Sequence, residues 1–528
     1  MNKKLQVWLP LLFSITMVIG MMLGYRMRDS QPGKSFFSID KTSRLQEVMD
    51  LVKNKYVDDV KVGSLSDTAI AAILSKLDPH SVFINAEEVQ SINEDIAGNF
   101  FGIGVEFGII EDTINVMNVI PEGPSFKAGI QTGDKFLKVD DSMVAGTKIS
   151  SDKIKKLLRG SNGTKVIIDI LRGSQRKTIN IERGIIPVSS VDAAYMMGEG
   201  NGYIRLNKFS QVTYREFMPA LEKLKKQGLQ KLILDLRGNG GGVLDEATAI
   251  ADEFLDGDKL ITYTEGKHFP KKEYRCKREG LFEKGTLVVL ADEGTASASE
   301  ILIGALQDWD RATIIGRRSF GKGLVQEQYD LNDGSALRLT VARYYTPVGR
   351  SIQRPYANGE KAYYNEISKR FHDGEVVSMD SVKNDTSKIF KTRGGKTVYG
   401  GGGISPDIFV PLDTNSTGIA TAKLYFKGTL SDFAYQYYMQ NQQKLLLYKT
   451  PMDFAGTFVL TDDNWKQFAG AALKDSVNIA AISAKEKEVL SLRLKAAVAR
   501  QVWRNEGLYE ILNMQDSTIK KALEVLKK

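Results

Sequence analysis

The chain has 528 residues, enough for three or four domains, and its 42% apolar and 26% charged residues are ordinary for a globular protein. The net charge of +8 comes from 72 basic and 64 acidic residues mixed along the chain, so we expect no nucleic-acid partner. The single cysteine, Cys276, excludes an internal disulfide. Only three histidines are present, which disfavours a histidine-ligated metal site and a Ser–His–Asp triad. We expect no metal and no other cofactor.

The N-terminus carries an apolar segment. Two lysines precede an uncharged run from Val7 to Tyr25, and two arginines close it. As a helix, these nineteen residues would extend about 30 Å, the thickness of a bilayer core. The run is longer than the apolar region of a cleaved signal peptide, and no good cleavage site follows it. We predict a membrane anchor within residues 1–30, with a signal peptide as the alternative, and an exported soluble body.

Residues 39–97 are predicted to be helical, because apolar residues such as Leu45, Val48 and Leu51 recur at helical spacing. Residues 98–183 are predicted to form a β-rich domain, because polar and apolar residues alternate there. Its expected elements are two strand pairs (Gly104–Ile110 with Thr113–Val119, and Val166–Leu171 with Thr178–Ile181), a turn at Gly133–Asp134 and a helix at Asp152–Leu158.

Residues 184–412 alternate between short apolar runs and helical segments, which indicates a layered α/β core. The expected strands are Tyr203–Leu206, Leu232–Leu236, Leu287–Leu290, Thr313–Ile315 and Leu337–Tyr345, and the expected helices Tyr214–Lys225, Leu244–Leu255 and Ser297–Gln307. Residues 355–396 are polar, and we interpret them as an irregular insertion. Residues 413–528 are predicted to be mostly helical. The expected fold class is therefore a mixed α/β core with an inserted β-rich domain, an N-terminal transmembrane helix and a helical C-terminal region.

A glycine-rich segment follows the strand that ends near Leu234. It reads Asp235-Leu236-Arg237-Gly238-Asn239-Gly240-Gly241-Gly242. Four glycines in five residues remove side-chain bulk, so that backbone N–H groups can approach a ligand closely. Asp235 and Arg237 could be catalytic, but we favour a pair at the end of the strand that fixes the glycine loop.

A second segment places a serine at the start of a helix. It reads Gly294-Thr295-Ala296-Ser297-Ala298-Ser299-Glu300 and leads into the apolar run Ile301–Leu306. A serine at this position is commonly only a helix cap. Here small neighbours leave room for a substrate carbonyl, and the first N–H groups of the helix, which lack intrahelical partners, point where an oxyanion would form.

A third segment offers a base. Lys322 lies between glycines in the run Phe320-Gly321-Lys322-Gly323-Leu324-Val325-Gln326. A lysine can accept a proton only when it is neutral, so the site must lower its pKa from the ordinary value of about 10.4. Burial has that effect. A Ser–Lys pair is a variant of the catalytic triad that needs no histidine.

Together these segments resemble the C-terminal processing peptidases, also called tail-specific or carboxyl-terminal proteases. The order of the three segments and the 25 residues from Ser297 to Lys322 match the family over roughly residues 40–412. The resemblance implies that Ser297 is the nucleophile, Lys322 the base and Gln326 the residue that orients the lysine. It also implies an oxyanion hole made by the backbone N–H groups of Gly242 and Ala298.

The same resemblance identifies residues 98–183 as a PDZ domain. Phe101-Gly102-Ile103-Gly104-Val105 is similar to the loop that holds a C-terminal carboxylate, which implies that Gly102, Ile103 and Gly104 bind the end of the substrate. Further landmarks of the family are Leu77-Asp78-Pro79-His80-Ser81, Pro124–Ile130, Thr346–Gln353 and Gly403–Asp407.

The implied protein is a serine endopeptidase that cleaves exported proteins recognised by their C-terminal tails. Its expected partners are protein or peptide substrates with free, apolar C-termini, the membrane through the N-terminal helix, and a second copy of the chain or an adaptor protein. The family implies a bacterial cell envelope, with an anchor in the inner membrane and the catalytic body in the periplasm.

Two other functions remain as alternatives. Gly316–Lys322 fits the first seven positions of a phosphate-binding loop, but the eighth position is Gly323, where magnesium coordination requires Ser or Thr. The other alternative is a non-catalytic PDZ scaffold on a degenerate protease fold. Loss of the serine or the lysine would mark such a scaffold, and both are present.

Overall fold

The structure is a computed structural model. It describes residue 8 and residues 13–22, 44–382, 388–413, 418–480 and 482–527, and the chain divides into two compact units, residues 1–73 and 74–528. Helices α2 (Arg44–Lys55), α3 (Val62–Leu74) and α4 (Ala86–Ala97) agree with the helical prediction for residues 39–97, which is wrong at strand β1 (Val82–Ile84).

A membrane-spanning helix is not found in the described ranges, where no helix combines the length and the apolar character that a bilayer requires. The predicted span from Val7 to Tyr25 includes residues 7, 9–12 and 23–25, which lie outside the described residues.

The second unit begins with strand β1 (Val82–Ile84) and helix α4 (Ala86–Ala97), and a β-rich domain follows. Strands β2 and β9 pair antiparallel and bring the entry and the exit of this domain together. The sheet between them has the order β3-β4-β5-β7-β8, with β6 beside β5, so β3 is an edge strand. The bounds are β2 (Asn99–Gly102), β3 (Val105–Ile110), β4 (Thr113–Val119), α5 (Pro124–Lys127), β5 (Lys135–Val139), β6 (Ser142–Met143), α6 (Ser151–Leu158), β7 (Lys165–Arg172), β8 (Gln175–Glu182) and β9 (Gly184–Pro187).

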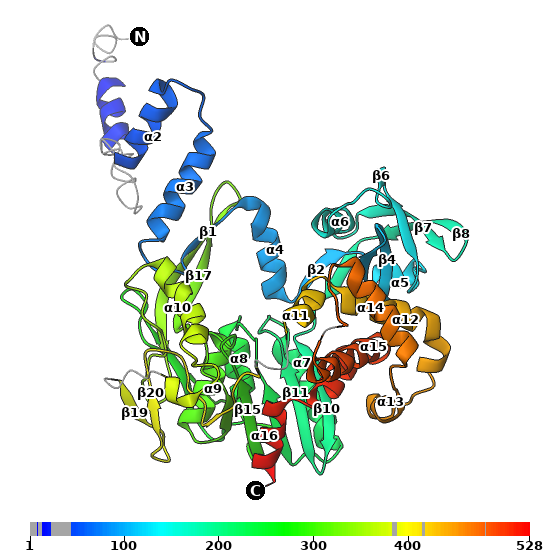
Figure 1. Ribbon diagram of the computed structural model, residues 1–528. Coiled ribbons are helices and arrows are strands. Elements are labelled where there is room, and N and C mark those ends of the chain that lie inside the picture. Colours follow the sequence, from blue (N-terminus) through cyan, green and yellow to red (C-terminus); the bar gives the residue numbers. More distant parts are fainter. Residues whose placement is uncertain are drawn as a thin grey trace. The chain divides into compact units, whose positions relative to one another are not determined.

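The central sheet of the core has the order β10-β11-β12-β15-β16-β21, parallel except for β10 (Figure 1). Helices α7, α8 and α9 pack on one face and α16 on the other, which explains the continuous apolar runs of the central strands. The bounds are β10 (Val191–Gly198), β11 (Asn201–Leu206), α7 (Thr213–Lys226), β12 (Lys231–Asp235), α8 (Leu244–Asp252), β15 (Thr286–Ala291), α9 (Ala298–Asp308), β16 (Thr313–Gly316), β21 (Ile408–Phe409) and α16 (Ser517–Leu526).

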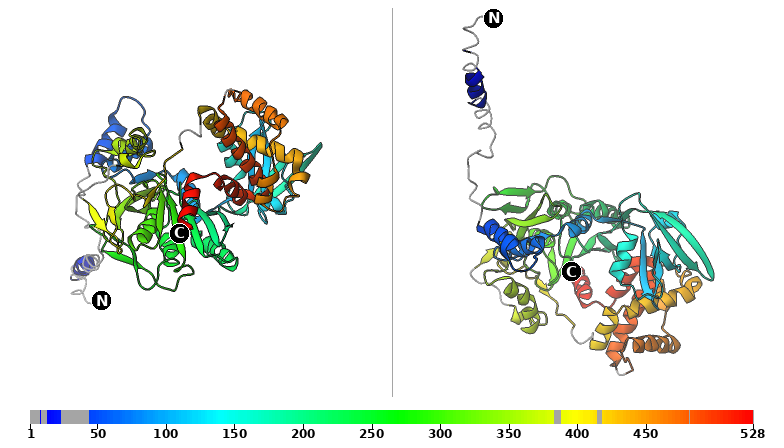
Figure 2. Two further views of the ribbon diagram at one scale, coloured as in Figure 1. Left: turned by 60° about the horizontal axis from the view of Figure 1, so that its bottom comes forward. Right: turned by 90° about the horizontal axis from the view of Figure 1, so that it is seen from above.

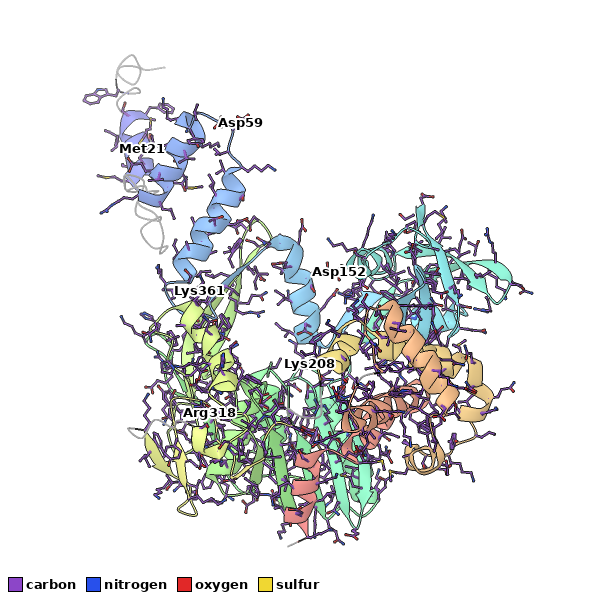
Figure 3. The ribbon with its side chains drawn as sticks, viewed as in Figure 1. Met21, Asp59, Asp152, Lys208, Arg318 and Lys361 are labelled. Carbon is purple, nitrogen blue, oxygen red and sulfur yellow. The ribbon has the colours of Figure 1, made fainter. Side chains whose placement is uncertain are left out.

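A second sheet of the core has the order β1-β18-β13-β14, with β17 on the other side of β18. Lys322 lies just before β17, and Tyr344 lies in β18. The bounds are β13 (Leu260–Glu265), β14 (Lys272–Arg275), β17 (Leu324–Asp330) and β18 (Ala336–Tyr345). Lys208, labelled in Figure 3, donates to Asp95 of α4 at 2.9 Å and so ties the helix before the β-rich domain to the core.

The irregular conformation expected for residues 355–396 is wrong for much of this segment. It contains helix α10 (Glu360–His372) and strand β19 (Ile389–Lys391), which pairs with β20 (Thr397–Tyr399) just after the segment. Only Tyr363 and Arg370 of α10 are buried, so the helix lacks the apolar periodicity that would have predicted it. The Arg370 guanidinium donates to the carbonyl of Ser319 at 2.8 Å, which anchors the helix through a polar contact instead.

The C-terminal region is helical, as predicted, and Figure 2 shows it from two further sides. Two apolar clusters join its helices. It also contacts the β-rich domain, because the Tyr435 hydroxyl donates to the carbonyl of Val116 in β4 at 3.3 Å. The bounds are α11 (Ile419–Phe426), α12 (Thr429–Leu445), α13 (Pro451–Thr457), α14 (Asp462–Lys474) and α15 (Ala484–Asn513).

Candidate active site

The glycine loop begins where β12 ends, and an ion pair fixes its start. The Arg237 backbone N–H and Nε both donate to Asp235 Oδ1 at 3.0 Å, and Arg237 Nη2 donates to Oδ2 at 2.7 Å. Arg205 Nη1 adds a contact of 2.9 Å. Although burial opposes ionisation, Arg237 and Arg205 hold the pKa of the Asp235 carboxyl below its usual range. Asp235 is thus an ionised anchor for the loop.

The last two glycines of the loop are closely packed, Gly241 against the serine segment and Gly242 against Phe209. A Cβ on Gly241 would stand 2.6 Å from the Ala296 carbonyl and 2.8 Å from Ser297 Cβ, and φ at Gly241 is +93°. A Cβ on Gly242 would stand 2.0 Å from the Phe209 carbonyl oxygen, and φ there is +141°. Only glycine fits these two positions. The loop therefore brings its backbone directly beside Ser297.

The predicted oxyanion donors are free in the described part of the chain. Neither the N–H of Gly242 nor that of Ala298 donates to another described residue. The neighbouring Val243 N–H, in contrast, donates to Phe209 O at 2.7 Å. Two unpaired N–H groups can donate hydrogen bonds to a negative oxygen.

Ser297 stands at the N-cap of α9 with φ 55° and ψ −117°, a conformation that L-residues rarely adopt. Its side chain is half-buried, and its hydroxyl makes no hydrogen bond to any described residue. Ser299 differs in both respects, because it is fully buried and its hydroxyl donates to the Asn239 carbonyl at 3.0 Å. Ser299 thus holds the glycine loop to α9, and Ser297 is the accessible hydroxyl.

A single buried carboxylate holds the serine and lysine segments together. Glu300 Oε2 accepts from the Ser297 N–H at 2.8 Å and from the Lys322 N–H at 2.9 Å. Glu300 Oε1 accepts from the Gly321 N–H at 2.7 Å and from the Ser319 hydroxyl at 2.5 Å. Burial raises the pKa of Glu300 to about 7, which these four donors oppose.

Tyr344 makes a second link between the two segments. Its hydroxyl lies 2.7 Å from the Lys322 carbonyl and 3.1 Å from the Ser297 carbonyl. The backbones of the serine and the lysine are therefore fixed relative to each other from two sides. Their side chains are not joined, since no hydrogen bond links Ser297 Oγ to Lys322 Nζ in the described ranges. Catalytic hydrogen bonds are often longer without substrate than in the reacting complex.

The surroundings of Lys322 favour its neutral form. Burial and the nearby Arg338 guanidinium lower the pKa of the Lys322 ammonium, and the carboxylates of Glu300 and Asp78 oppose this shift. Burial, with Lys322 close by, also lowers the pKa of His80 to about 4, so that its imidazole is neutral at pH 7. His80 Nε2 lies 2.9 Å from the Tyr363 hydroxyl.

Gln326 lies on β17, after the lysine. Its amide Nε2 donates to Thr340 Oγ1 at 3.3 Å, and Thr340 Oγ1 in turn donates to Asp78 Oδ1 at 3.0 Å. No hydrogen bond between Gln326 and Lys322 is found among the residues that the structure describes. The orienting role of Gln326 therefore stays a prediction.

The carboxylate-binding loop predicted in the β-rich domain lies between β2 and β3. Gly102 closes β2, and neither Ile103 nor Gly104 donates its N–H to another described backbone group. The Ile103 side chain enters the apolar core of the domain. Gly104 has φ +77°, and a Cβ there would stand 3.0 Å from Ile186 Cδ1. Free N–H groups beside the edge strand β3 suit a peptide that adds as a further strand.

Three observations bear on other kinds of site. The N–H groups of Gly321 and Lys322, which a phosphate loop would offer to a nucleotide, already donate to Glu300. Burial raises the pKa of Cys276 to about 12, which disfavours a reactive thiolate. In the described ranges, no group of three His, Cys, Asp or Glu residues could hold a metal ion.

No role is predicted from the sequence for Glu300 or Tyr344. Glu300 lies three residues after Ser297, which is the spacing of a capping box. This spacing was the one sequence feature that could have pointed to Glu300. No sequence pattern predicted a role for Tyr344. Its hydroxyl reaches the site from β18, and Tyr344 lies 22 residues after Lys322 in the chain.

Comparisons with known proteins match three parts of the chain. Residues 200–358 match peptidase family S41, residues 102–182 a PDZ domain, and residues 421–504 a family of unknown function (DUF8443).

The chain is 37% identical over 352 residues to a probable CtpA-like serine protease of Staphylococcus haemolyticus, which covers 66% of this chain and 69% of that protein. It is 36% identical over 317 residues to a carboxy-terminal-processing protease of Bartonella bacilliformis, which covers 59% of this chain and 72% of that protein. The solved structure of a photosystem II D1 C-terminal processing protease is 28% identical, with a TM-score of 0.36 over 71% of this chain and 87% of that one.

Proposed function

Because this chain belongs to the C-terminal processing serine proteases of peptidase family S41, we propose that it hydrolyses peptide bonds with a Ser297–Lys322 dyad in exported proteins selected by their C-terminal tails. The observation that carries the proposal is the Glu300 carboxylate, which accepts the backbone N–H of both Ser297 and Lys322. One buried group thus fixes the backbones of the two residues that carry the hydroxyl and the amine of lowered pKa.

In the proposed reaction, neutral Lys322 Nζ takes the proton of Ser297 Oγ, and this oxygen forms a bond to the scissile carbonyl carbon. The N–H groups of Gly242 and Ala298 donate to the oxyanion. The tetrahedral intermediate then collapses, the C–N bond breaks, and the lysine returns its proton to the leaving amine. Water, deprotonated by Lys322, hydrolyses the acyl-serine in a second addition and elimination.

Substrate selection is assigned to the PDZ domain. A terminal carboxylate would accept from the free N–H groups of Ile103 and Gly104, and the preceding residues would pair with the edge strand β3. The adjoining core of the domain is apolar, so a charged final side chain would lose its hydration without gaining a partner. We propose that bound tails are apolar and that binding brings Ser297 Oγ within reach of Lys322 Nζ.

Amidation of the substrate tail is expected to slow cleavage by about 10-fold or more, since a hydrogen-bonded charged group contributes about 1.5–3 kcal/mol. The measurement is kcat/KM for two peptides that differ only in a free or an amidated C-terminus. In a Gly104→Ala variant, where a Cβ would press on Ile186, the two peptides should be cut at nearly equal rates.

Gly173→Ala provides the matched control for this experiment. Gly173 also has positive φ, +60°, but lies in the β7–β8 turn with open space around it. This variant should keep the preference for the free tail. Equal cleavage of free and amidated peptides by the unaltered enzyme would refute tail recognition, even if proteolysis persisted.

We further propose that residues 7–25 anchor the protein in the inner membrane of a bacterial envelope, with the catalytic body in the periplasm. The support is the uncharged run of nineteen residues between basic flanks. Protease added to intact spheroplasts is expected to digest the body, detected by antibody, while a cytoplasmic marker protein survives. Survival of both would refute this topology.

A further inference from the structure

The C-terminal helical region contacts the glycine loop of the candidate active site. Arg237, the third residue of that loop segment, donates its Nη1 to Asp516 Oδ2 at 2.8 Å. Asp516 lies between α15 and α16, 279 residues further along the chain. The contact joins the loop that carries one proposed oxyanion donor to a part of the chain outside the matched peptidase segment, residues 200–358.

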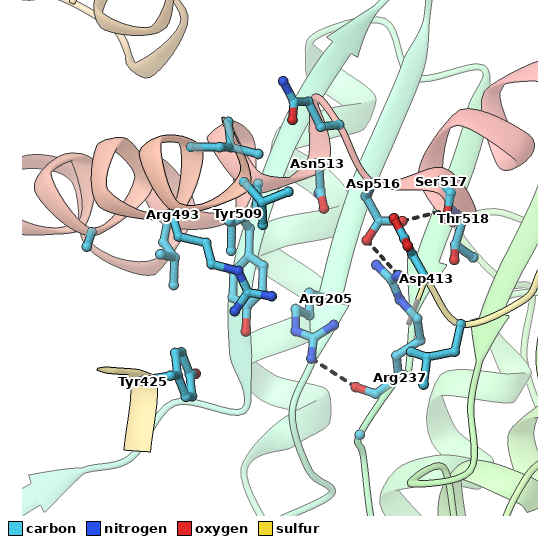
Figure 4. A pocket seen from close by; sticks show the side chains of 18 of the residues that line it. Arg205, Arg237, Asp413, Tyr425, Arg493, Tyr509, Asn513, Asp516, Ser517 and Thr518 are labelled. Carbon is cyan, nitrogen blue, oxygen red and sulfur yellow. Dashed lines mark hydrogen bonds and ion pairs between the residues drawn. The ribbon is translucent and has the colours of Figure 1, made fainter. Parts of the chain in front are cut away.

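Asp516 has two separate tasks, one for each carboxylate oxygen. Oδ1 accepts from the N–H groups of Thr518 and Ile519, at 2.8 and 3.0 Å, and so caps α16. Oδ2 accepts from Arg237. Since α16 packs Ile519 and Ala522 against the core sheet, the cap holds the carboxylate in a fixed place (Figure 4).

The preceding helix, α15, is anchored to the core as well. Asn505 Nδ2 donates to Asp192 Oδ1 at 2.9 Å, and Asn513 Nδ2 donates to the Tyr195 hydroxyl at 2.8 Å. The Arg205 guanidinium lies 4.7 Å from the centre of the Tyr509 ring. The turn that carries Asp516 is therefore held on both sides.

The same helix is tied to the PDZ domain where it kinks. Arg504, with φ 57° and ψ −150°, and Arg500 both pair with Glu106 of the edge strand β3, the second at 3.3 Å. An L-residue in this conformation costs about 1–3 kcal/mol and persists where its surroundings fix it. The C-terminal region thus spans from the strand proposed to bind tails to the loop proposed to bind the oxyanion.

A cavity lies beside Arg237. The cavity has a volume of about 980 Å³ and is bordered by Arg237 and Gly238 on the core side and by Tyr509 and Asp516 on the helical side (Figure 4). Asp235 holds one side of the Arg237 guanidinium. Without Asp516, its Nη1 would face open space, and the loop could move toward the cavity.

We propose that Asp516 is a positioning residue of the protease, which acts through Arg237 to hold the glycine loop so that the Gly242 N–H meets the oxyanion. The inference rests on the proposed function. It gives the C-terminal helical region a part in the peptidase reaction. An oxyanion donor must stand within about 2.7–3.1 Å of its target, so a small displacement of the loop lowers the rate of acylation more than substrate affinity.

Two substitutions separate the two tasks of Asp516 in the full-length protein. Asp516→Asn keeps an oxygen for the cap but replaces the Arg237 acceptor by an amide N–H₂. Asp516→Glu keeps a carboxylate for Arg237 but caps the helix less well. We expect kcat to fall about 10-fold in Asp516→Asn with KM within about 2-fold, and to be largely retained in Asp516→Glu, because a lost charged hydrogen bond corresponds to about that factor. We expect Tm to be lower in Asp516→Glu than in Asp516→Asn.

A merely structural role gives a different result, in which kcat falls in step with Tm. Thr461→Ala is the matched control, because Thr461 caps α14 in the same region through its hydroxyl, which accepts from the Asn464 N–H at 3.2 Å. This variant should lower Tm without changing kcat.

Unchanged kcat in Asp516→Asn, or an equal loss in Asp516→Glu, would overturn the positioning role. Either result, obtained with an unaltered enzyme that cleaves its peptide, would leave the Ser–Lys proposal intact. Absence of cleavage by the unaltered enzyme would instead refute the proposed function.

Discussion

Replacement of Ser297 by alanine is expected to reduce kcat by a factor on the order of 10⁴ or more, because the acyl-enzyme can no longer form. The fold should survive, since the hydroxyl makes no hydrogen bond to a described residue and the half-buried alanine leaves no large cavity. The measurement is peptide hydrolysis beside the Tm of both proteins, together with loss of labelling by a serine-reactive fluorophosphonate.

Ser299→Ala is the matched control, because it removes the same atoms two residues later in the same helix. Its hydroxyl holds the Asn239 carbonyl, so we expect a loss of stability of about 1–3 kcal/mol and retention of most activity. An active Ser297→Ala together with an inactive Ser299→Ala would move the nucleophile to the second serine.

Replacement of Lys322 by arginine is expected to reduce kcat about as strongly as loss of the serine. A guanidinium stays protonated at every pH at which the protein is folded, so it cannot take the serine proton. Lys208→Arg is the matched control, because Lys208 pairs with Asp95 at 2.9 Å in a contact that arginine can also make. Full activity of Lys322→Arg would refute the Ser–Lys mechanism.

The pH dependence of kcat/KM provides a second test of the base. Only the neutral amine accepts a proton, so activity should rise with pH through the pKa of Lys322 and be lost on the acid side. Burial and Arg338 lower this pKa, so the midpoint should lie below the ordinary lysine value. Protonation of Glu300, whose pKa burial raises to about 7, would add a loss in the same direction by weakening its contact with the Lys322 N–H.

The sequence by itself determined the core elements and the proposed reacting groups. Strands such as Thr113–Val119 and Leu232–Leu236 appear close to their predicted bounds, because the burial of alternate or continuous apolar residues is a local property of a strand. Ser297, Lys322 and the glycine loop stood out because each is an unusual residue choice for its local structure. Helix α10 was not predicted, because polar contacts such as that of Arg370 with Ser319 hold it and it lacks apolar periodicity.

Only the tertiary structure decided how these segments are held together. Glu300 looked like a helix-capping residue, but its carboxylate also accepts from the lysine segment, and Tyr344 reaches both backbones from another sheet. Asp516 looked like one more polar residue before a helix, and its contact with Arg237 spans 279 residues. A buried hydrogen bond between distant segments depends on where the folded chain places two polar groups. Local periodicity in the sequence does not predict that placement.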